Sequence, residues 1–427
     1  MGGRVRHVWR AVTAPRSTGG RAALLATTLS IAGFVPALSY VAAAGEGGAL
    51  VGTWNHYPTN IRASGYVVTE LGCAQARSAA ALDRMFRDRV GPILGLDNAH
   101  VIPLGGQNFL WLFNDVFLDY TNRGTTINGA VFIRNAAVLQ QRDCFSLVRR
   151  GDKRRMLSFE PGDLLAPDAD GREDRFWPLG GEVHDRRLTI FWAEMENDDP
   201  PPAGDGIKRH PVRTWIGTYD VASLERLDLR PAKNDGVFPQ YGFAVASDDE
   251  HTYLFGNSNL LNLTFEGGFY NGPHSATKMF LARVPLGDLS AALEYRTADG
   301  WSRRANDAVP ISERFWTDNG MQPRYLDGHW LAVTKIDGFW GTETIVETAR
   351  DPWGPWTIVS KRTITPFRGF DVMNNYQPII LPYRGPSGDL IIVMAQNARN
   401  WNDAVDDPSM YRLSVYREPW PFRESAN

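Results

Sequence analysis

Two aspartates, Asp97 and Asp115, stand at the ends of a hairpin that is otherwise strongly apolar. The residues between them form two apolar stretches joined by a Gly-Gly turn. A carboxylate buried without a partner is costly, so both side chains should face water or a polar site. Glycoside hydrolysis generally needs two carboxylates, one as the acid and the other as nucleophile or base. These residue types therefore indicate acid–base chemistry on a glycosidic bond.

The hairpin that carries these acids recurs along the chain. Each copy has a short apolar strand, a turn containing Gly, Asp or Asn, and a second, more aromatic strand. The copies lie at 100–115, 177–194, 241–257, 322–335 and 377–396. The sequence between them can supply two outer strands per copy, and four-stranded units repeated radially predict an all-β, five-bladed β-propeller. A two-sheet sandwich is the alternative, but it does not account for five similar hairpins.

The propeller geometry brings Asp97 and Asp115 together. The first strand of each blade lies nearest the channel and the second runs antiparallel to it, so the start of one and the end of the other share a rim. Equivalent positions at the ends of the other second strands hold Glu194, Asn257, Lys335 and Gln396, and the entrances of the first strands add Tyr241, Gln322, Tyr376 and Gln377. These residues predict a polar cup with aromatic walls, suited to a sugar.

Two interpretations of these polar residues remain open. Glu194 is a third candidate catalytic acid, and the rim residues Tyr241, Asn257, Gln322, Lys335, Tyr376 and Gln377 are candidate substrate contacts. The structural alternative is that an acid such as Asp97, followed by Asn, caps a turn by accepting local backbone N–H groups.

The N-terminal residues 1–44 have the features of a secretory signal. A basic leader without acids precedes an apolar core at 22–35, and small residues at 42–44 precede Gly45. An uncleaved anchor is the alternative, since 22–44 is nearly long enough to span a bilayer. We therefore expect an exported protein, secreted or membrane-anchored, with 45–427 as a single propeller domain.

Export bears on the two cysteines, Cys73 and Cys144, because disulfides persist outside the cytoplasm. The sequence makes them a candidate pair but leaves the pairing open. The segment 74–90, between them, has the composition of a helix and predicts a short insert before the first blade.

Several classes of function receive no support. The net charge of −3 does not suggest a nucleic-acid-binding protein. The chain contains no GxSxG, Walker or Rossmann motif, and its eight histidines form no HxxxH or HExxH pattern. We expect no cofactor, although spacing leaves a structural ion in the channel open. The expected partner is a polysaccharide or oligosaccharide, and the protein is expected to be a monomer.

With these residues in view, the chain resembles the exported five-bladed propellers of the domain-of-unknown-function 4185 type and their relative numbered 5005. The resembling segments are 96–118, 132–140, 241–256, 280–289, 351–356 and 376–397. Some members of the 4185 type are endo-D-arabinanases that act on bacterial cell-wall arabinan. The resemblance therefore implies a propeller fold and a glycoside hydrolase activity.

The opening hairpin carries the family's acids with altered neighbours. The family pattern has an Asp-Gly entrance and a Gly-Asp-Thr ending. This chain has Asp97-Asn98 and Asn114-Asp115-Val116 at those positions, so both acids survive while Gly and Thr do not. Those two departures leave the identity of the substrate open.

Two further positions follow from the resemblance and from a broader analogy. Arg134 and Asn135 match a polar pair after the first blade, which implies that they line the same cleft. Propellers of glycoside hydrolase families 43 and 117 also place carboxylates around a central pocket. Their acid usually comes from a later blade, where this chain has Asn257, so their three-acid scheme is not copied here.

Three functions remain open at this stage. The first is an exported glycoside hydrolase acting on a furanosidic or related polysaccharide such as cell-wall arabinan, with Asp97, Asp115 and Glu194 as catalytic candidates. The second is a carbohydrate-binding or adhesion propeller, whose acids would accept hydrogen bonds from sugar hydroxyls. The third is a polysaccharide lyase, in which Lys335 would neutralise a uronate.

Overall fold

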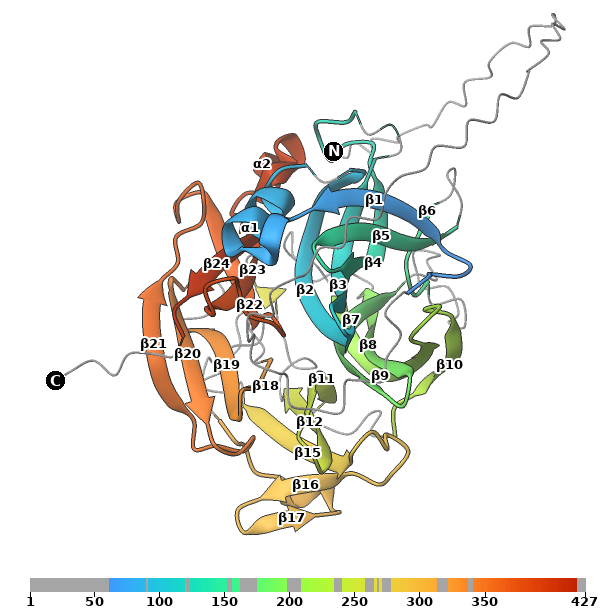
Figure 1. Ribbon diagram of the computed structural model, residues 1–427. Helices are drawn as coiled ribbons and strands as arrows, with labels where there is room; N and C mark the ends of the chain where they lie inside the picture. The colour runs from blue at the N-terminus through green and yellow to red at the C-terminus, as the bar shows by residue number, and fades with distance from the viewer. Residues whose placement is uncertain are drawn as a thin grey trace, which may run out of the picture. The chain divides into compact units, whose positions relative to one another are not determined.

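The computed structural model describes residues 61–420, apart from 90, 120, 122, 152–155, 162–174, 198–208, 234–239, 258–264, 267–268, 271–277, 313–321 and 337–340. For 76, 156, 196–197, 209–212, 240, 257, 265–266 and 269–270 it describes the backbone only. Five antiparallel sheets lie around a common centre, with their first strands innermost (Figure 1). This arrangement confirms the predicted five-bladed β-propeller.

The first blade has the most strands. Its inner hairpin is β2 (Ile93–Gly105) and β3 (Asn108–Leu118), followed by β4 (Val131–Gln141) and β5 (Cys144–Gly151). Two strands that the sequence did not predict also pair with β5: β1 (Val67–Cys73) and the short β6 (Met156–Leu157). β1 escaped prediction because it lies at the outer edge, where few of its side chains need to be apolar.

The other blades follow the predicted hairpins. The second contains β7 (Phe176–His184), β8 (Arg187–Asn197), β9 (Arg209–Asp220) and β10 (Arg226–Pro231). The third contains β11 (Gln240–Ser247), β12 (His251–Asn257), β15 (Met279–Pro285), β16 (Glu294–Thr297) and β17 (Gly300–Ser302), with η4 (Ala305–Asp307) after it. The fourth contains β18 (Arg324–Leu326), β19 (His329–Ile336), β20 (Glu343–Ala349) and β21 (Thr357–Thr363). The fifth contains β22 (Met373–Ile380), β23 (Leu390–Ala398) and β24 (Leu413–Glu418), and a separate ribbon pairs β13 (Phe265–Glu266) with β14 (Phe269–Tyr270).

The inner hairpins are apolar because each blade packs between two others. Nearly every residue of β2 and β3 is buried, so these strands carry continuous apolar runs instead of an alternating pattern. Large aromatics fill the spaces between sheets; Trp111, Trp192 and Trp330 are all buried. Trp111 packs against the fifth blade, in a core that includes Tyr376 and Ile379.

A short helix precedes the inner hairpin of the first blade, as predicted. The segment forms η2 (Gln75–Arg77) and α1 (Ala79–Arg87), and the side chain of Ser78 caps α1 by accepting from the backbone N–H of Ala81. The helix is shorter than the predicted 74–90. Leu82 and Phe86 bury its apolar face in the core shared by the first and fifth blades.

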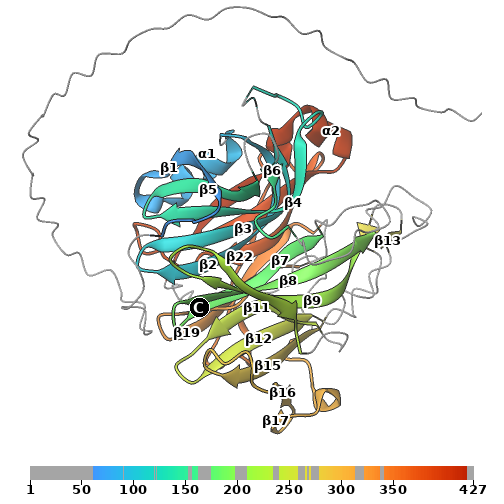
Figure 2. The same ribbon diagram turned by 90° about the vertical axis from the view of Figure 1, so that its right-hand side faces the viewer.

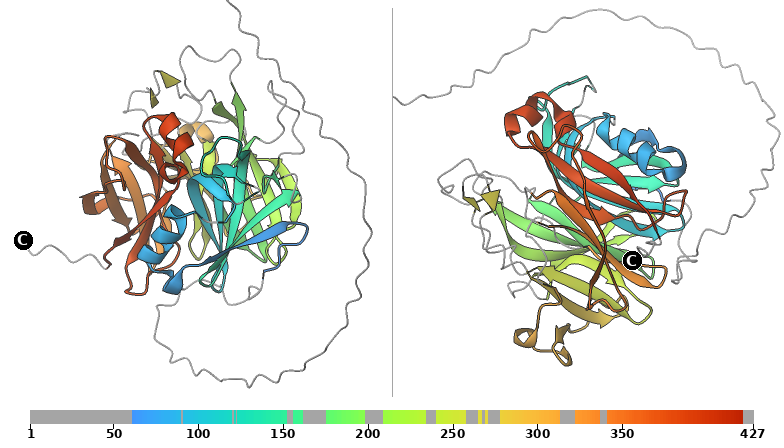
Figure 3. Two further views of the ribbon diagram at one scale, coloured as in Figure 1. Left: turned by 90° about the horizontal axis from the view of Figure 1, so that it is seen from above. Right: turned by 90° about the vertical axis from the view of Figure 1, so that its left-hand side faces the viewer.

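The helix also covers the outer edge of the last blade. Within the described ranges the fifth blade has three strands, so β24 pairs only with β23. The backbone N–H of Val415 on β24 donates to Asp83 of α1 at 3.1 Å. Figure 3 shows α1 beside the last strands of the chain. A helix therefore occupies the place of an outer strand.

A second helical insert lies between β23 and β24. It consists of α2 (Trp401–Asp406) and η5 (Pro408–Met410), and the sequence did not predict it because six residues give no helical period. α2 lies beside the connection between β3 and β4 (Figure 2), where the N–H of Ile127 donates to the carbonyl of Val405 at 2.9 Å.

The ring closes where the fifth blade meets the first. The N–H of Leu96 donates to the carbonyl of Tyr411 at 2.9 Å, and Arg412 Nε donates to the carbonyl of Leu94 at 2.8 Å. The rings of Phe109 and Tyr383 lie 4.6 Å apart, between centroids, across the same junction. Side chains and backbone groups thus join the ends of the propeller.

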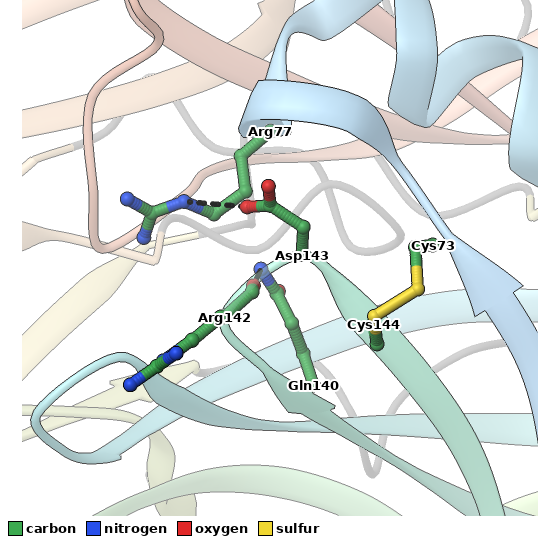
Figure 4. The surroundings of a disulfide bond; sticks show 6 residues. All are labelled: Cys73, Arg77, Gln140, Arg142, Asp143 and Cys144. Carbon is green, nitrogen blue, oxygen red and sulfur yellow. Dashed lines mark hydrogen bonds and ion pairs between the residues drawn. A yellow bond between two sulfur atoms is a disulfide. The ribbon is translucent and has the colours of Figure 1, made fainter. Parts of the chain in front are cut away.

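The two cysteines form a disulfide. Cys73 on β1 and Cys144 on β5 lie directly opposite in the strand pairing, with Cα atoms 3.9 Å apart. Beside them, Arg77 pairs with Asp143 at 3.5 Å (Figure 4). The pairing that the sequence left open is therefore present, and it fastens β1 and the start of the helical insert to the first blade.

The predicted signal peptide, residues 1–44, lies outside the described residues. Within the part of the chain that the structure describes, no helix is long and apolar enough to cross a membrane.

Removing the disulfide should destabilise the propeller. Replacing Cys73 and Cys144 with Ser opens a loop spanning 71 residues, and the chain-entropy model predicts a loss of about 4 kcal/mol in the free energy of unfolding. Guanidinium denaturation of the oxidised wild type and the double variant measures this difference. A variant as stable as the oxidised wild type would contradict the prediction.

Candidate functional site

Irregular strands shape the rim on which Asp97 and Asp115 lie. Asp97 on β2 pairs with Asn114 on β3, and the register shifts on both sides of it. Asn98, Asp115 and Gln377 each have a positive φ, at 26°, 47° and 46°. Such a backbone is uncommon for residues other than glycine, and bulges of this kind redirect side chains at the rims of sheets.

Asp97 lies in an environment that favours its neutral form. Protein surrounds the carboxyl group, although the side chain keeps a partly exposed surface. The pKa of Asp97 is raised to about 7: burial is the main cause and the negative charge of Asp115 adds to it, while the hydrogen bonds from the hydroxyl of Tyr376 and the N–H of Asn98 act in the opposite direction. The hydroxyl of Tyr376 donates to Asp97 Oδ1 at 2.5 Å. The backbone N–H of Asn98 donates to the same oxygen at 2.7 Å. The hydroxyl of Tyr411 also donates to this carboxylate.

Asp115 has partners that favour its ionised form. Its Oδ1 accepts from Arg134 Nη1 at 3.1 Å and from Trp177 Nε1, contributed by the second blade, also at 3.1 Å. Asp115 and Arg134 are both buried, at 7% and 3% exposure. A buried guanidinium paired with a carboxylate stabilises the negative charge through a charge-assisted hydrogen bond.

The two environments give the acids different roles. A carboxyl group that is neutral near pH 7 beside one that is kept charged is the arrangement from which a general acid and a nucleophile or base are made. The negative charge of Asp115 is one of the influences that favour the protonated form of Asp97. The rim can therefore donate a proton from Asp97 while Asp115 presents a negative charge.

The sequence places the chain in a family. A model of the family described as a domain of unknown function, DUF5005, matches residues 81–417. The chain belongs to this family. The match confirms the relationship expected from the opening hairpin, and it spans every inner hairpin of this DUF5005 propeller, including both acids.

Individual relatives share the fold at low identity. Protein J′ of the notoamide biosynthesis cluster of Aspergillus versicolor is 25% identical over 263 residues, which cover 56% of this chain and 67% of the relative. A Bacteroides ovatus protein described as a "putative hydrolase" superposes with a TM-score of 0.58 at 17% identity, over 79% of this chain and 88% of that one. A xylan β-1,4-xylosidase of Bacillus halodurans gives a TM-score of 0.45 at 10% identity, over 77% and 53%. The likeness to the Bacteroides ovatus structure shows the fold alone.

Within the described part of the chain, the inner strands of the DUF5005 propeller leave little space at the centre of the ring. His100, Gly180 and Arg324 line a cavity of only about 10 Å³, roughly the space of one water molecule. Arg324 spans the channel by donating to the carbonyls of Val101 at 2.5 Å and Ile380 at 3.2 Å. Among the described residues there is no group of three or more His, Cys, Asp or Glu side chains placed to hold a metal ion.

Glu194, the third predicted acid, forms a buried ion pair. Its Oε1 accepts from Arg175 Nη2 at 3.0 Å and its Oε2 from Trp215 Nε1 at 2.7 Å, and its exposure is 6%. Both oxygens are thus engaged inside the second blade, by an arginine and a tryptophan, the same two residue types that bind Asp115.

Two predicted substrate contacts lie in the interior. Asn135 is fully buried; its Nδ2 donates to the carbonyls of Glu160 and Phe176, and its Oδ1 accepts from the N–H of Glu160. Lys335 is 1% exposed and its Nζ donates to Asn374 Oδ1 at 2.8 Å. Both side chains link neighbouring blades, and we do not place them among the substrate contacts.

The remaining predicted contacts divide between rim, channel and core. Tyr376 binds Asp97, and the partly exposed Gln377 follows it on the rim. Gln322 lines the narrow channel, and Tyr241 is buried, with its ring 5.4 Å from that of Tyr295. Asn257 lies opposite Gln240 at the end of β12, and its side chain lies outside the described residues.

Sequence reasoning missed two residues that contact the acids. Trp177 is the first residue of the second hairpin, and its indole N–H reaches Asp115 on another blade. Tyr411 follows the unpredicted α2 and η5, so no repeat placed it beside Asp97. Arg134 was found, but only through the family resemblance.

Asp97 should make the fold pH-sensitive. Its pKa of about 7 exceeds the unfolded value of 3.8, so the stability it contributes is present at low pH and is lost as the pH rises through 7. An Asn side chain does not titrate. Between pH 5 and pH 8 the wild type should therefore lose stability that Asp97→Asn does not lose. The free energy of unfolding of the variant, relative to that of the wild type, should rise by roughly 2 kcal/mol over this range. Urea denaturation at both pH values measures this difference. Glu250→Gln, at an exposed position, is the control, and its stability relative to wild type should be the same at both pH values.

Glu194→Gln should destabilise the protein. The change leaves the guanidinium of Arg175 buried without its counter-charge, at an expected loss of about 3 kcal/mol in the free energy of unfolding. Replacing both partners with Met should cost less than the single change. A Glu194→Gln variant as stable as wild type but without activity would instead return Glu194 to the catalytic residues.

Proposed function

We propose that the protein is a glycoside hydrolase in which Asp97 is the general acid and Asp115 is the second catalytic carboxylate. The observation that carries the proposal is the contrast between these two carboxyl groups. The pKa of Asp97 is raised to about 7, while Asp115 accepts hydrogen bonds from Arg134 and Trp177. Glycosidases separate the roles of two carboxylates in this way.

The reaction would use the two groups on one bond. Asp97 donates its proton to the glycosidic oxygen as the bond to the anomeric carbon breaks. Asp115 either attacks that carbon directly or takes a proton from the attacking water. If Asp115 has attacked the carbon, water then displaces it and gives its proton to Asp97; if Asp115 has taken the proton of the attacking water, it releases that proton to solvent and Asp97 regains one from solvent. Tyr376 and Tyr411 hold the acid in place throughout.

For the substrate, we propose a furanosidic or related polysaccharide such as cell-wall arabinan. The resemblance of the opening hairpin to the arabinan-degrading propellers supports this class. A leader-like N-terminus and the Cys73–Cys144 disulfide support a location outside the cytoplasm, where such polymers occur.

One observation favours a second candidate, a carbohydrate-binding propeller without catalysis. Asp97 already accepts hydrogen bonds from Tyr376, Tyr411 and the N–H of Asn98. A carboxylate held this way could also position a sugar hydroxyl without transferring a proton.

Asp97→Asn and Asp115→Asn should each reduce hydrolysis by at least about a thousandfold, because each removes one of the two essential carboxyl groups. Purified protein is incubated with arabinan and xylan panels and the products are resolved by mass. Glu250→Gln, an exposed acid on a turn between strands, is the matched control and should keep full activity.

The pH profile tests the assignment of Asp97 independently. Activity should fall as the pH rises through about 7, because the general acid loses its proton there. Binding of the polymer without any product from the wild-type protein would favour the second candidate. Full activity in either Asn variant would refute the catalytic assignment.

A further inference from the structure

A line of aromatic side chains runs from the surface to the acid pair. The rings of Trp401 and Phe117 lie 5.9 Å apart, and those of Phe117 and Phe132 lie 5.0 Å apart. The guanidinium of Arg134 lies 4.7 Å from the centre of the Phe132 ring. Arg134 in turn binds Asp115 at 3.1 Å. We call Trp401, Phe117, Phe132 and Arg134 the aromatic ladder.

The strands account for this order. Phe117 on β3 pairs directly with Phe132 on β4, and Phe132 and Arg134 are two residues apart, so they share a face of the sheet. Trp401 comes from α2, the insert of the fifth blade. Its ring also meets Tyr411 edge-on at 5.3 Å. Because Tyr411 binds Asp97, the ladder leads to both carboxylates.

Exposure distinguishes the ladder from ordinary core packing. Trp401 is 43% exposed, and Phe117 and Phe132 are half-buried, whereas Trp111 and Trp192 between the blades are fully buried. Exposure falls along the ladder to 3% at Arg134. Aromatic surface that stays open to water beside a polar site is available to a ligand.

We propose that the aromatic ladder binds consecutive sugar rings of an oligosaccharide whose scissile bond lies at Asp97 and Asp115. The apolar C–H faces of sugars pack on aromatic rings, and their hydroxyls reach the polar groups of the rim. The ligand is then a chain of several sugars, not a single terminal residue. The placement of the scissile bond rests on the proposed function, whereas binding of the chain does not.

Trp401→Ala tests the ladder, because this exposed side chain can be removed with little loss of core packing. Its KM for arabinan or xylan oligosaccharides should rise by roughly tenfold for long chains, the size of one aromatic contact. The kcat, and the KM for the shortest cleaved substrate, should stay unchanged. Phe132→Leu should raise KM for long chains in the same way, and because the Phe132 ring packs against Arg134 it should also lower kcat.

The control is Tyr325→Ala, which removes an equally accessible aromatic near the turn of the fourth inner hairpin, with 36% exposure. It should leave every kinetic parameter unchanged. Thermal unfolding of all three variants shows whether a change is structural. An effect of Trp401→Ala that is the same for every chain length, or no effect, would overturn the ladder.

Binding without turnover separates this proposal from the proposed function. The Asp97→Asn, Asp115→Asn double variant is measured on soluble arabinan and xylan by affinity electrophoresis, with and without Trp401→Ala. Weaker retention on removal of Trp401, together with a wild-type protein that cleaves nothing, would support the ladder and refute the hydrolase. If neither polymer retains any of the variants, the proposed role of the aromatic ladder is refuted.

Discussion

The contact between Tyr376 and Asp97 joins residues 279 positions apart, and it exists only because the last blade meets the first. A blade buries its apolar faces against its neighbours, so the terminal blades can complete their cores only against each other. The bonds of Leu96 with Tyr411 and of Arg412 with Leu94 hold that junction. The candidate site lies on this junction, so its geometry depends on closure of the whole ring.

Closure also sets the electrostatics of the site. The surfaces that exclude water from Asp97 are the ones that bury the junction, and exclusion of water favours the neutral carboxyl group. Asp115 sits only one residue beyond the partner of Asp97 in the strand pairing, but it faces Arg134 and, on the second blade, Trp177. Contacts from three blades thus favour the neutral form of Asp97 and the charged form of Asp115. The positive φ of Asp115 is part of this arrangement.

The architecture could be predicted because it repeats: five similar hairpins and antiparallel geometry were enough to bring Asp97 and Asp115 to one rim. Side-chain direction could not be predicted in the same way. Asn135 and Lys335 sit near rim positions in the sequence, yet they turn between blades to satisfy groups of the neighbouring sheet. Trp177 shows the opposite case: nothing in the sequence placed it at the site, yet its indole N–H reaches an acid on another blade. Such contacts depend on blade-to-blade packing and on bulges, which leave no local pattern.

The helix α1 has a consequence for how this protein behaves among copies of itself. A three-stranded last blade would present a row of unpaired backbone groups along β24, and such an edge recruits strands from other chains. Asp83 satisfies one of those groups, on Val415, and the body of the helix covers the approach. The segment that leads into α1 is held by the Cys73–Cys144 bond. Protection of the last edge against intermolecular β-sheet growth is therefore tied to an oxidised first blade.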